Sequence, residues 1–104
     1  IKLNGYRIEL DEINEKILAQ ENIDEARTIG LKRNDKVVRI VSLFQSSAFV
    51  DIDIIKADLS SSLSHYMVPS DILQVADFPK NQSGKIDRNE LQEFYLEKKK
   101  LGRK

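Results

Sequence analysis

A short loop near the C-terminal end of the sequence has residue types that suit the binding of an anion. It runs Asn81-Gln82-Ser83-Gly84-Lys85. Small residues allow the backbone to approach a ligand closely, and a lysine supplies a point charge. The spacing is not that of a Walker A phosphate loop, because the loop holds a single glycine. Taken alone, these residues fit either an anion site or a surface turn with a solvated lysine.

Two cations at the start of the sequence are a second candidate for anion binding. The dipeptide Asn4-Gly5 predicts a β-hairpin with a two-residue type I′ turn, which places Lys2 opposite Arg7. Facing like charges repel at a cost of up to about 1 kcal/mol, and Glu9 on the same face offsets part of it. The face is therefore either a screened, solvated surface or a site for an anion such as a phosphate.

The remaining chemically active side chains have ordinary structural explanations. His65 is expected at the C-terminal end of the second helix, where a cation is mildly favourable, in a capping or packing role. Asp87 is expected to cap the last helix. Some aromatic residues fall at core-compatible positions, so we expect no aromatic binding face. They are Tyr6, Phe78, Phe94 and Tyr95.

Composition excludes several classes of function. Lys+Arg and Asp+Glu both number 17 in 104 residues, so no overall field favours nucleic acid or an anionic membrane as a partner. With no cysteine and one histidine, we expect no metal site and no disulfide framework. No apolar run approaches the roughly 18 residues of a membrane span. We expect a cytoplasmic protein without nucleic-acid or membrane partners.

Hydrophobic patterns predict the order hairpin, helix, two strands, helix, strand, helix. The first helix begins near Leu10 and ends before Asn22. The next two strands are joined at Asn34-Asp35, and the second of them is expected to be covered on both faces. The predicted strands are 26–31, 37–44 and 72–76.

The second half of the chain is predicted to hold two more helices. One has a stripe of apolar side chains that runs from Ile52 to Tyr66. This helix is expected to be capped by Asp51 and to end at Pro69. The last helix starts after Asp87 and presents an apolar face of Leu91, Phe94 and Tyr95. The elements give an α+β domain, a small mixed sheet with an N-terminal β-hairpin and helices packed against it. We expect one domain over 1–97, followed by a basic tail or linker over 98–104.

Four segments, taken in order, resemble the C-terminal subdomain of the adenylate-forming superfamily of acyl-CoA synthetases, luciferases and peptide-synthetase adenylation domains. They are 1–10, 63–69, 78–80 and 81–91. Within the superfamily, the run from Arg7 to Ile13 and the run from Ser83 to Arg88 are most similar to enzymes that load carrier proteins. These are peptide-synthetase adenylation domains and D-alanine-carrier protein ligases. Ser83, where asparagine is common in that branch, is more usual in CoA ligases.

The resemblance implies part of a two-step ligase. A carboxylic or amino acid attacks the α-phosphate of ATP to give an acyl-adenylate, and the pantetheine thiol of a carrier protein, or CoA, then takes the acyl group as a thioester. ATP and Mg²⁺ are expected to bind mainly to a large N-terminal adenylation domain that is absent here. We therefore expect a fragment that is inactive alone and acts as a lid with two orientations.

The resemblance also assigns roles to residues. It makes Lys85 the catalytic lysine that enters the active site for adenylation, in a loop supported by Ser83 and Gly84. It places Gly5 beside the tunnel for the thiol and ties Lys2 and Arg7 to the thioester step. The alternatives are the lid of an acyl-CoA ligase and a non-catalytic module that docks a carrier protein.

Overall fold

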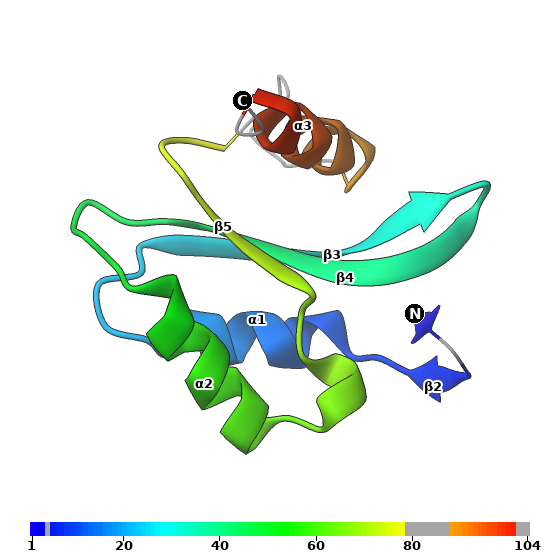
Figure 1. Cartoon of the computed structure of the whole chain (residues 1–104), viewed down its shortest axis with the longest axis horizontal. Coiled ribbons are helices and arrows are strands. Elements are labelled where there is room, and N and C mark those ends of the chain that lie inside the picture. Colours follow the sequence, from blue (N-terminus) through cyan, green and yellow to red (C-terminus); the bar gives the residue numbers. More distant parts are fainter. Residues whose placement is uncertain (4, 79–87, 102–104) are drawn as a thin grey trace.

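Helices cover both faces of a small central sheet (Figure 1). The computed structural model describes residues 1–3, 5–78 and 88–101. Its class is the predicted one, α+β with an N-terminal hairpin. In chain order the elements are β1 (Lys2–Leu3), β2 (Tyr6–Arg7), α1 (Leu10–Leu18), β3 (Glu25–Arg33), β4 (Lys36–Gln45), α2 (Ile52–Ser62), the 3₁₀ helix η1 (His65–Met67), β5 (Asp71–Val75) and α3 (Arg88–Leu101).

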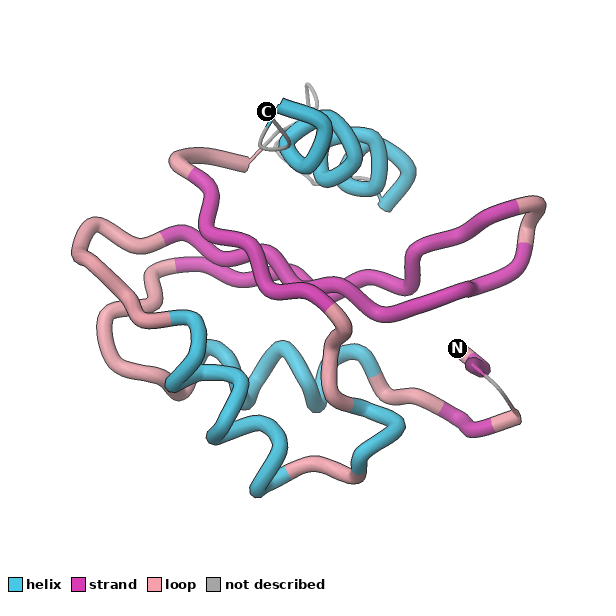
Figure 2. The backbone as a smooth tube through the Cα atoms, in the orientation of Figure 1, coloured by secondary structure: helices cyan, strands magenta, loops and turns pink. Residues whose placement is uncertain are grey.

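The central sheet is mixed, as expected, and has the strand order β3-β4-β5. β3 and β4 are antiparallel and meet at Asn34 and Asp35, whose φ angles of 54° and 64° are positive, as a type I′ turn requires. β5 lies parallel to β4, and the chain reaches it through α2 and η1 (Figure 2). This crossover is needed because parallel neighbours cannot be joined by a tight turn.

The sheet separates two groups of buried apolar side chains. α1 and α2 cover one face and α3 covers the other (Figure 1). One buried polar side chain, Ser42, lies within the sheet, and its hydroxyl is 2.8 Å from the hydroxyl of Thr28. The α1–α2 side is built from residues including Ile13, Ile17, Ile40, Phe44, Ile55 and Leu59, and the α3 side from residues including Ile29, Leu31, Val41, Leu43, Leu91 and Tyr95.

The prediction that the second long strand is covered on both faces is correct for only part of β4. Residues from Ile40 to Phe44 are buried without a break. Lys36, Val38 and Arg39 are exposed, because β4 pairs with β5 only from Val41 onward. The β3–β4 hairpin therefore extends beyond the third strand of the sheet.

The prediction that Pro69 ends the second helix is wrong. α2 stops at Ser62, and Leu63 is extended, with φ −114° and ψ 154°. The hydroxyls of Ser61 and Ser62 both donate to the carbonyl oxygen of Asp58 at 2.9 Å. Serine side chains compete for backbone partners and weaken a helix, so the chain leaves the helix before the proline. The predicted cap at the other end is confirmed, since the Asp51 carboxylate accepts from the Asp53 N–H at 3.0 Å.

Polar contacts join α3 to the sheet besides its apolar face. The Gln92 side-chain amide bonds the peptide group of Lys32 twice, accepting from its N–H at 2.8 Å and donating to its carbonyl oxygen at 3.0 Å. The Tyr95 hydroxyl donates to Asp71 Oδ2 at 2.6 Å, and Lys99 Nζ lies 3.1 Å from the same oxygen. α3 is therefore held at β3 and at β5.

The charge of Asp71 is stabilised at this contact. Partial burial raises the pKa of Asp71, but the hydrogen bonds from Tyr95 and Lys99 and the positive charge of Lys99 outweigh burial. The pKa of this carboxyl therefore lies below its ordinary value of 3.8. Within the described ranges, none of the helices has the length and apolar character to pass through a membrane.

Candidate functional site

The N-terminal hairpin forms with the predicted register. Lys2 faces Arg7 and Leu3 faces Tyr6. The ladder continues outward through the Ile8 N–H, which donates to the Ile1 carbonyl oxygen at 2.7 Å. The hairpin is short, so the side chains around it must hold it in place.

The two facing cations are partly neutralised within the hairpin. Both side chains are exposed, and Arg7 Nε lies 2.8 Å from Glu9 Oε1, as the sequence suggested. An exposed ion pair of this kind contributes about 0.2–1 kcal/mol. One of the two positive charges, on Lys2, has no carboxylate partner in the described part of the chain. The hairpin therefore presents a small excess of positive charge to solvent.

Gly5 is at the exposed turn of the hairpin. Its φ is +84°, a conformation that L-amino acids with a side chain rarely adopt. A Cβ built on Gly5 would meet no heavy atom within 4 Å. The domain itself therefore leaves open space at Gly5, and its own demand for glycine comes from the backbone conformation.

An exposed aromatic cluster fixes the hairpin to η1. The rings of Tyr6 and Tyr66 stack with centroids 4.1 Å apart at 10°, and His65 meets both rings edge-on. The expectation that Tyr6 belongs to the core is wrong, because the residue is 45% exposed. His65 lies in η1 and not at the end of α2 as expected, and of the capping and packing roles expected for it the structure shows packing on aromatic rings. The sequence gave no sign of this contact, because strands of two residues are too short to show an alternating pattern of apolar and polar side chains.

The predicted catalytic loop lies outside the described residues. Ser83, Gly84 and Lys85, with the expected cap Asp87, fall in 79–87. On the N-terminal side of this segment, Phe78 is buried in the α3-side core. On the other side, α3 begins at Arg88. The structure thus describes both ends that hold the segment, and the loop's role stays a prediction.

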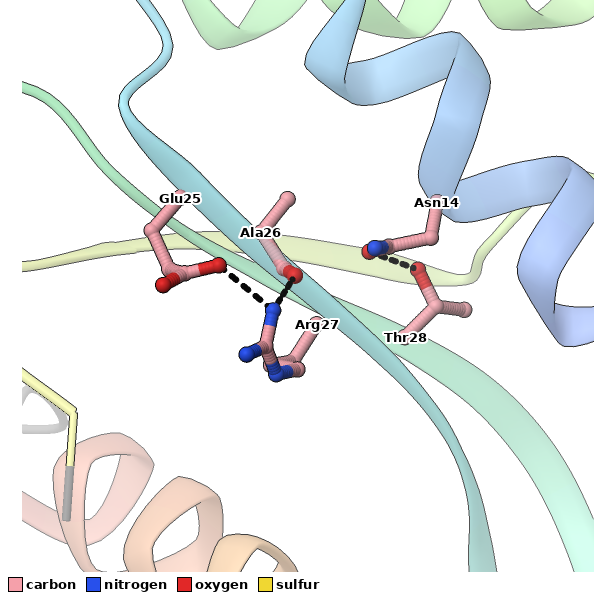
Figure 3. A network of polar contacts seen from close by, with 5 residues as sticks. All are labelled: Asn14, Glu25, Ala26, Arg27 and Thr28. Carbon is pink, nitrogen blue, oxygen red and sulfur yellow. Dashed lines mark hydrogen bonds and ion pairs between the residues drawn. The ribbon is translucent and has the colours of Figure 1, made fainter. Parts of the chain in front are cut away.

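A polar hollow lies where α3 begins. It has a volume of about 160 Å³ and lies between the start of α1, the middle of β3 and the first turn of α3. Arg27 projects from β3 on the side away from α1, next to Glu25, while Thr28 turns the other way and donates to Asn14 Oδ1 at 3.3 Å (Figure 3). Sequence reasoning gave Arg27 no role, because nothing local distinguishes it from other charged strand residues. The lining residues are Leu10, Asp11, Asn14, Arg27, Thr28, Ile29, Arg88 and Leu91.

The hairpin holds three of the residues to which the resemblance gives a role. Lys2, Gly5 and Arg7 are brought together on one exposed turn. Among residues 1–3, 5–78 and 88–101, no three His, Asp or Glu side chains are grouped so as to hold a metal ion. The geometry fits contact with an anionic group and with a chain passing close to a glycine backbone.

The fold is similar to a part of solved adenylate-forming enzymes. Apo MatB from Rhodopseudomonas palustris superposes with a TM-score of 0.77 at 26% identity, covering 88% of this chain and 19% of that one. A four-domain nonribosomal peptide synthetase bound to AMP and glycine gives a TM-score of 0.77 at 30% identity, covering 86% and 7%. These likenesses confirm the resemblance to the C-terminal subdomain of such enzymes.

Curated proteins that are similar in sequence to this chain include ligases that load a carrier protein. D-alanine–D-alanyl carrier protein ligases of Staphylococcus aureus are 36% identical over 98 residues, which cover 89% of this chain and 20% of those proteins. The chain thus spans about a fifth of the length of the curated relatives it matches. No protein-family model matches the chain. The predicted similarity to carrier-protein-loading ligases is confirmed.

Proposed function

We propose that residues 1–97 form the mobile C-terminal subdomain of an ATP-dependent ligase, with 98–104 as a basic tail or linker. The full-length enzyme activates a carboxylic or amino acid as an acyl-adenylate and transfers it to the pantetheine thiol of a carrier protein. The similarity to D-alanyl carrier protein ligases supports this acceptor and makes D-alanine the first acid to test. A large N-terminal domain completes the enzyme and supplies most of the ATP site.

The observation that carries the proposal is the exposed hairpin. In a chain similar to carrier protein ligases, it offers a glycine turn free of neighbours and two facing cations. A glycine backbone gives a thin pantetheine arm room to pass, and the charges of Lys2 and Arg7 suit its phosphate. We assign these three residues to the thioester step.

Adenylation is assigned to Lys85, with Ser83 and Gly84 as its loop support. Negative charge is shared among carboxylate, phosphate and ribose oxygens in that step, and a flexible ammonium in a water-poor site stabilises it strongly. ATP is supported by a MatB structure from Rhodopseudomonas palustris with ATP bound, whose TM-score to this chain is 0.77 at 25% identity, covering 88% of this chain and 18% of that one. Mg²⁺ is assigned mainly to the large domain, as the resemblance to adenylate-forming ligases implies.

The test uses the full-length protein that contains this chain. ATP–pyrophosphate exchange is measured with D-alanine and a panel of other small acids, and acylation is followed on the holo carrier protein. We expect exchange that depends on one acid and a thioester on the carrier. Absence of exchange with every acid would contradict the ligase proposal, and exchange followed by acylation of CoA alone would assign the chain to a CoA ligase.

A further inference from the structure

The N-terminal hairpin has a cationic face and an apolar face. Side chains alternate along a strand, so Tyr6 lies on the face opposite to that of Lys2 and Arg7. Tyr6 is 45% exposed and is not part of the core on the α1–α2 side of the sheet. The contact that Tyr6 makes is therefore separate from the core packing of the other side chains on this face. These are Ile1, Leu3 and Ile8.

The two ends of the hairpin are held in different ways. Away from the turn, the Ile8 N–H bonds the Ile1 carbonyl oxygen at 2.7 Å, and Ile8 is 1% exposed. At the turn, a Cβ on Gly5 would meet no heavy atom within 4 Å. The next residue, Tyr6, stacks on Tyr66 with the ring centroids 4.1 Å apart. The stack is thus a contact that the domain makes one residue away from the Gly5 turn.

Tyr66 is itself fixed to the central sheet. It lies in η1 between Leu63 and Met67, which are 8% and 7% exposed. The Met67 N–H donates to the carbonyl oxygen of Ser64 at 2.8 Å and closes the 3₁₀ turn. Three residues later, the N–H and the hydroxyl of Ser70 both donate to the carbonyl oxygen of Ile40 in β4, at 2.9 and 3.1 Å. Tyr66 therefore offers Tyr6 a support that is anchored on both sides.

The two tyrosines meet through their rings and not through their hydroxyls. In the part of the chain that the structure describes, neither hydroxyl forms a hydrogen bond. His65 adds edge-on contacts, with its centroid 6.2 Å from that of Tyr6 and 5.5 Å from that of Tyr66. Aromatic rings attract one another in these arrangements. Phenylalanine should therefore be able to replace Tyr66, whereas a small aliphatic residue should not.

We propose that Tyr66 is a positioning residue for the thioester step, an inference that rests on the proposed function. Its ring supports Tyr6 and so holds the Gly5 turn in one orientation, which gives the pantetheine arm a preformed path. Tyr66 acts through Tyr6 and does not touch the reacting atoms. A small displacement of a group that aligns two reactants slows their reaction by up to about 10²-fold. A purely structural role for the stack predicts instead a loss of folding stability with no effect on one step in the folded enzyme.

The test measures acyl transfer from pre-formed adenylate by the full-length ligase, at a temperature where every variant is folded. Tyr66→Ala should lower kcat for transfer by at least about tenfold, with KM for the holo carrier protein close to that of the wild type. The loss should persist with free pantetheine as acceptor, because the turn acts on the arm and not on the carrier. Pyrophosphate exchange should stay unchanged. Tyr66→Phe should keep the wild-type rate of transfer.

A double-mutant cycle tests whether the two tyrosines act as one unit. Tyr6→Ala removes an exposed side chain, so this variant should fold, and it should slow transfer by the same factor as Tyr66→Ala. The variant with both substitutions should be no slower than either single variant, because the first substitution already removes the contact. Effects that multiply, to roughly a hundredfold in the double variant, would overturn the proposal.

Gln92→Ala is the matched control, because it removes two hydrogen bonds between α3 and β3 and so weakens the fold away from the hairpin. The folded control should transfer at the wild-type rate. Equal slowing by Gln92→Ala and Tyr66→Ala, or a wild-type kcat in folded Tyr66→Ala, would overturn the proposal. So would a raised KM for the carrier with an unchanged kcat. If the wild-type protein forms adenylate but transfers it to no thiol, the proposed function itself fails, so the two failures are distinguished.

Discussion

Replacement of Gly5 by leucine separates the two reaction steps that we assign to this domain. The residue has φ +84°, so any side chain costs about 1–2 kcal/mol of backbone strain. No heavy atom lies within 4 Å of the new Cβ, so the domain adds little steric cost at that point. We therefore expect the 104-residue chain to remain folded, with a melting temperature lowered by roughly 4–16 °C.

The effect on catalysis should be much larger and confined to one step. In the full-length enzyme, a leucine side chain at the turn is expected to obstruct the thiol, so acyl transfer from pre-formed adenylate should slow by more than about tenfold, or about 1.4 kcal/mol. Pyrophosphate exchange should stay close to wild type. Lys2→Ala and Arg7→Ala should slow the same step more mildly, since each leaves one cation of the facing pair in place.

Two further substitutions separate backbone strain from bulk. Gly5→Ala carries the strain of a positive φ with a minimal side chain, and Gly5→Asn introduces a residue that tolerates this conformation. If side-chain size decides the rate, acyl transfer should be fastest in the alanine variant, slower in the asparagine variant and slowest in the leucine variant. A leucine variant that remains folded and loses exchange and transfer equally would refute a step-specific role for the hairpin.

The remaining predictions concern how the domain is held together. Because the pKa of Asp71 is lowered on folding, its carboxylate stabilises the native state above pH 3.8, and this contribution is lost as the pH falls through the lower folded-state value. The difference in unfolding free energy between wild type and Asp71→Asn should therefore shrink below pH 3.8, and a constant difference would argue against it. Gln92→Ala should lower the free energy of unfolding by about 1–3 kcal/mol through its two lost bonds to Lys32, whereas the exposed neighbour Glu93→Ala should have little effect. Tyr66→Ala should lose about 1 kcal/mol of stacking with Tyr6, which Tyr66→Phe should retain; equal unfolding curves for both variants would show that the stack contributes nothing.

Local patterns in the sequence were sufficient for much of the fold. Asn4-Gly5 predicted the hairpin register, and the spacing of Ile13 and Ile17 predicted the buried face of α1. Asn34-Asp35 predicted the turn between the long strands. Each of these signals depends on residues a few positions apart, where backbone preference and side-chain periodicity decide the outcome.

Features that depend on distant contacts were not predictable in this way. The stack of Tyr6 on Tyr66 and the bonds of Gln92 to Lys32 each join residues about 60 positions apart. α2 ended early because serine hydroxyls took the backbone carbonyl of Asp58, which outweighed the apolar stripe that continued to Tyr66.

The central claim is tested most directly at Lys85, by measuring both half-reactions of Lys85→Ala in the full-length enzyme. If this domain is the lid of an adenylating ligase, pyrophosphate exchange should fall by well over tenfold, while acyl transfer from pre-formed adenylate to the carrier protein should be far less affected. A loss of exchange of less than about tenfold, equivalent to about 1.4 kcal/mol of transition-state stabilisation, would contradict the account.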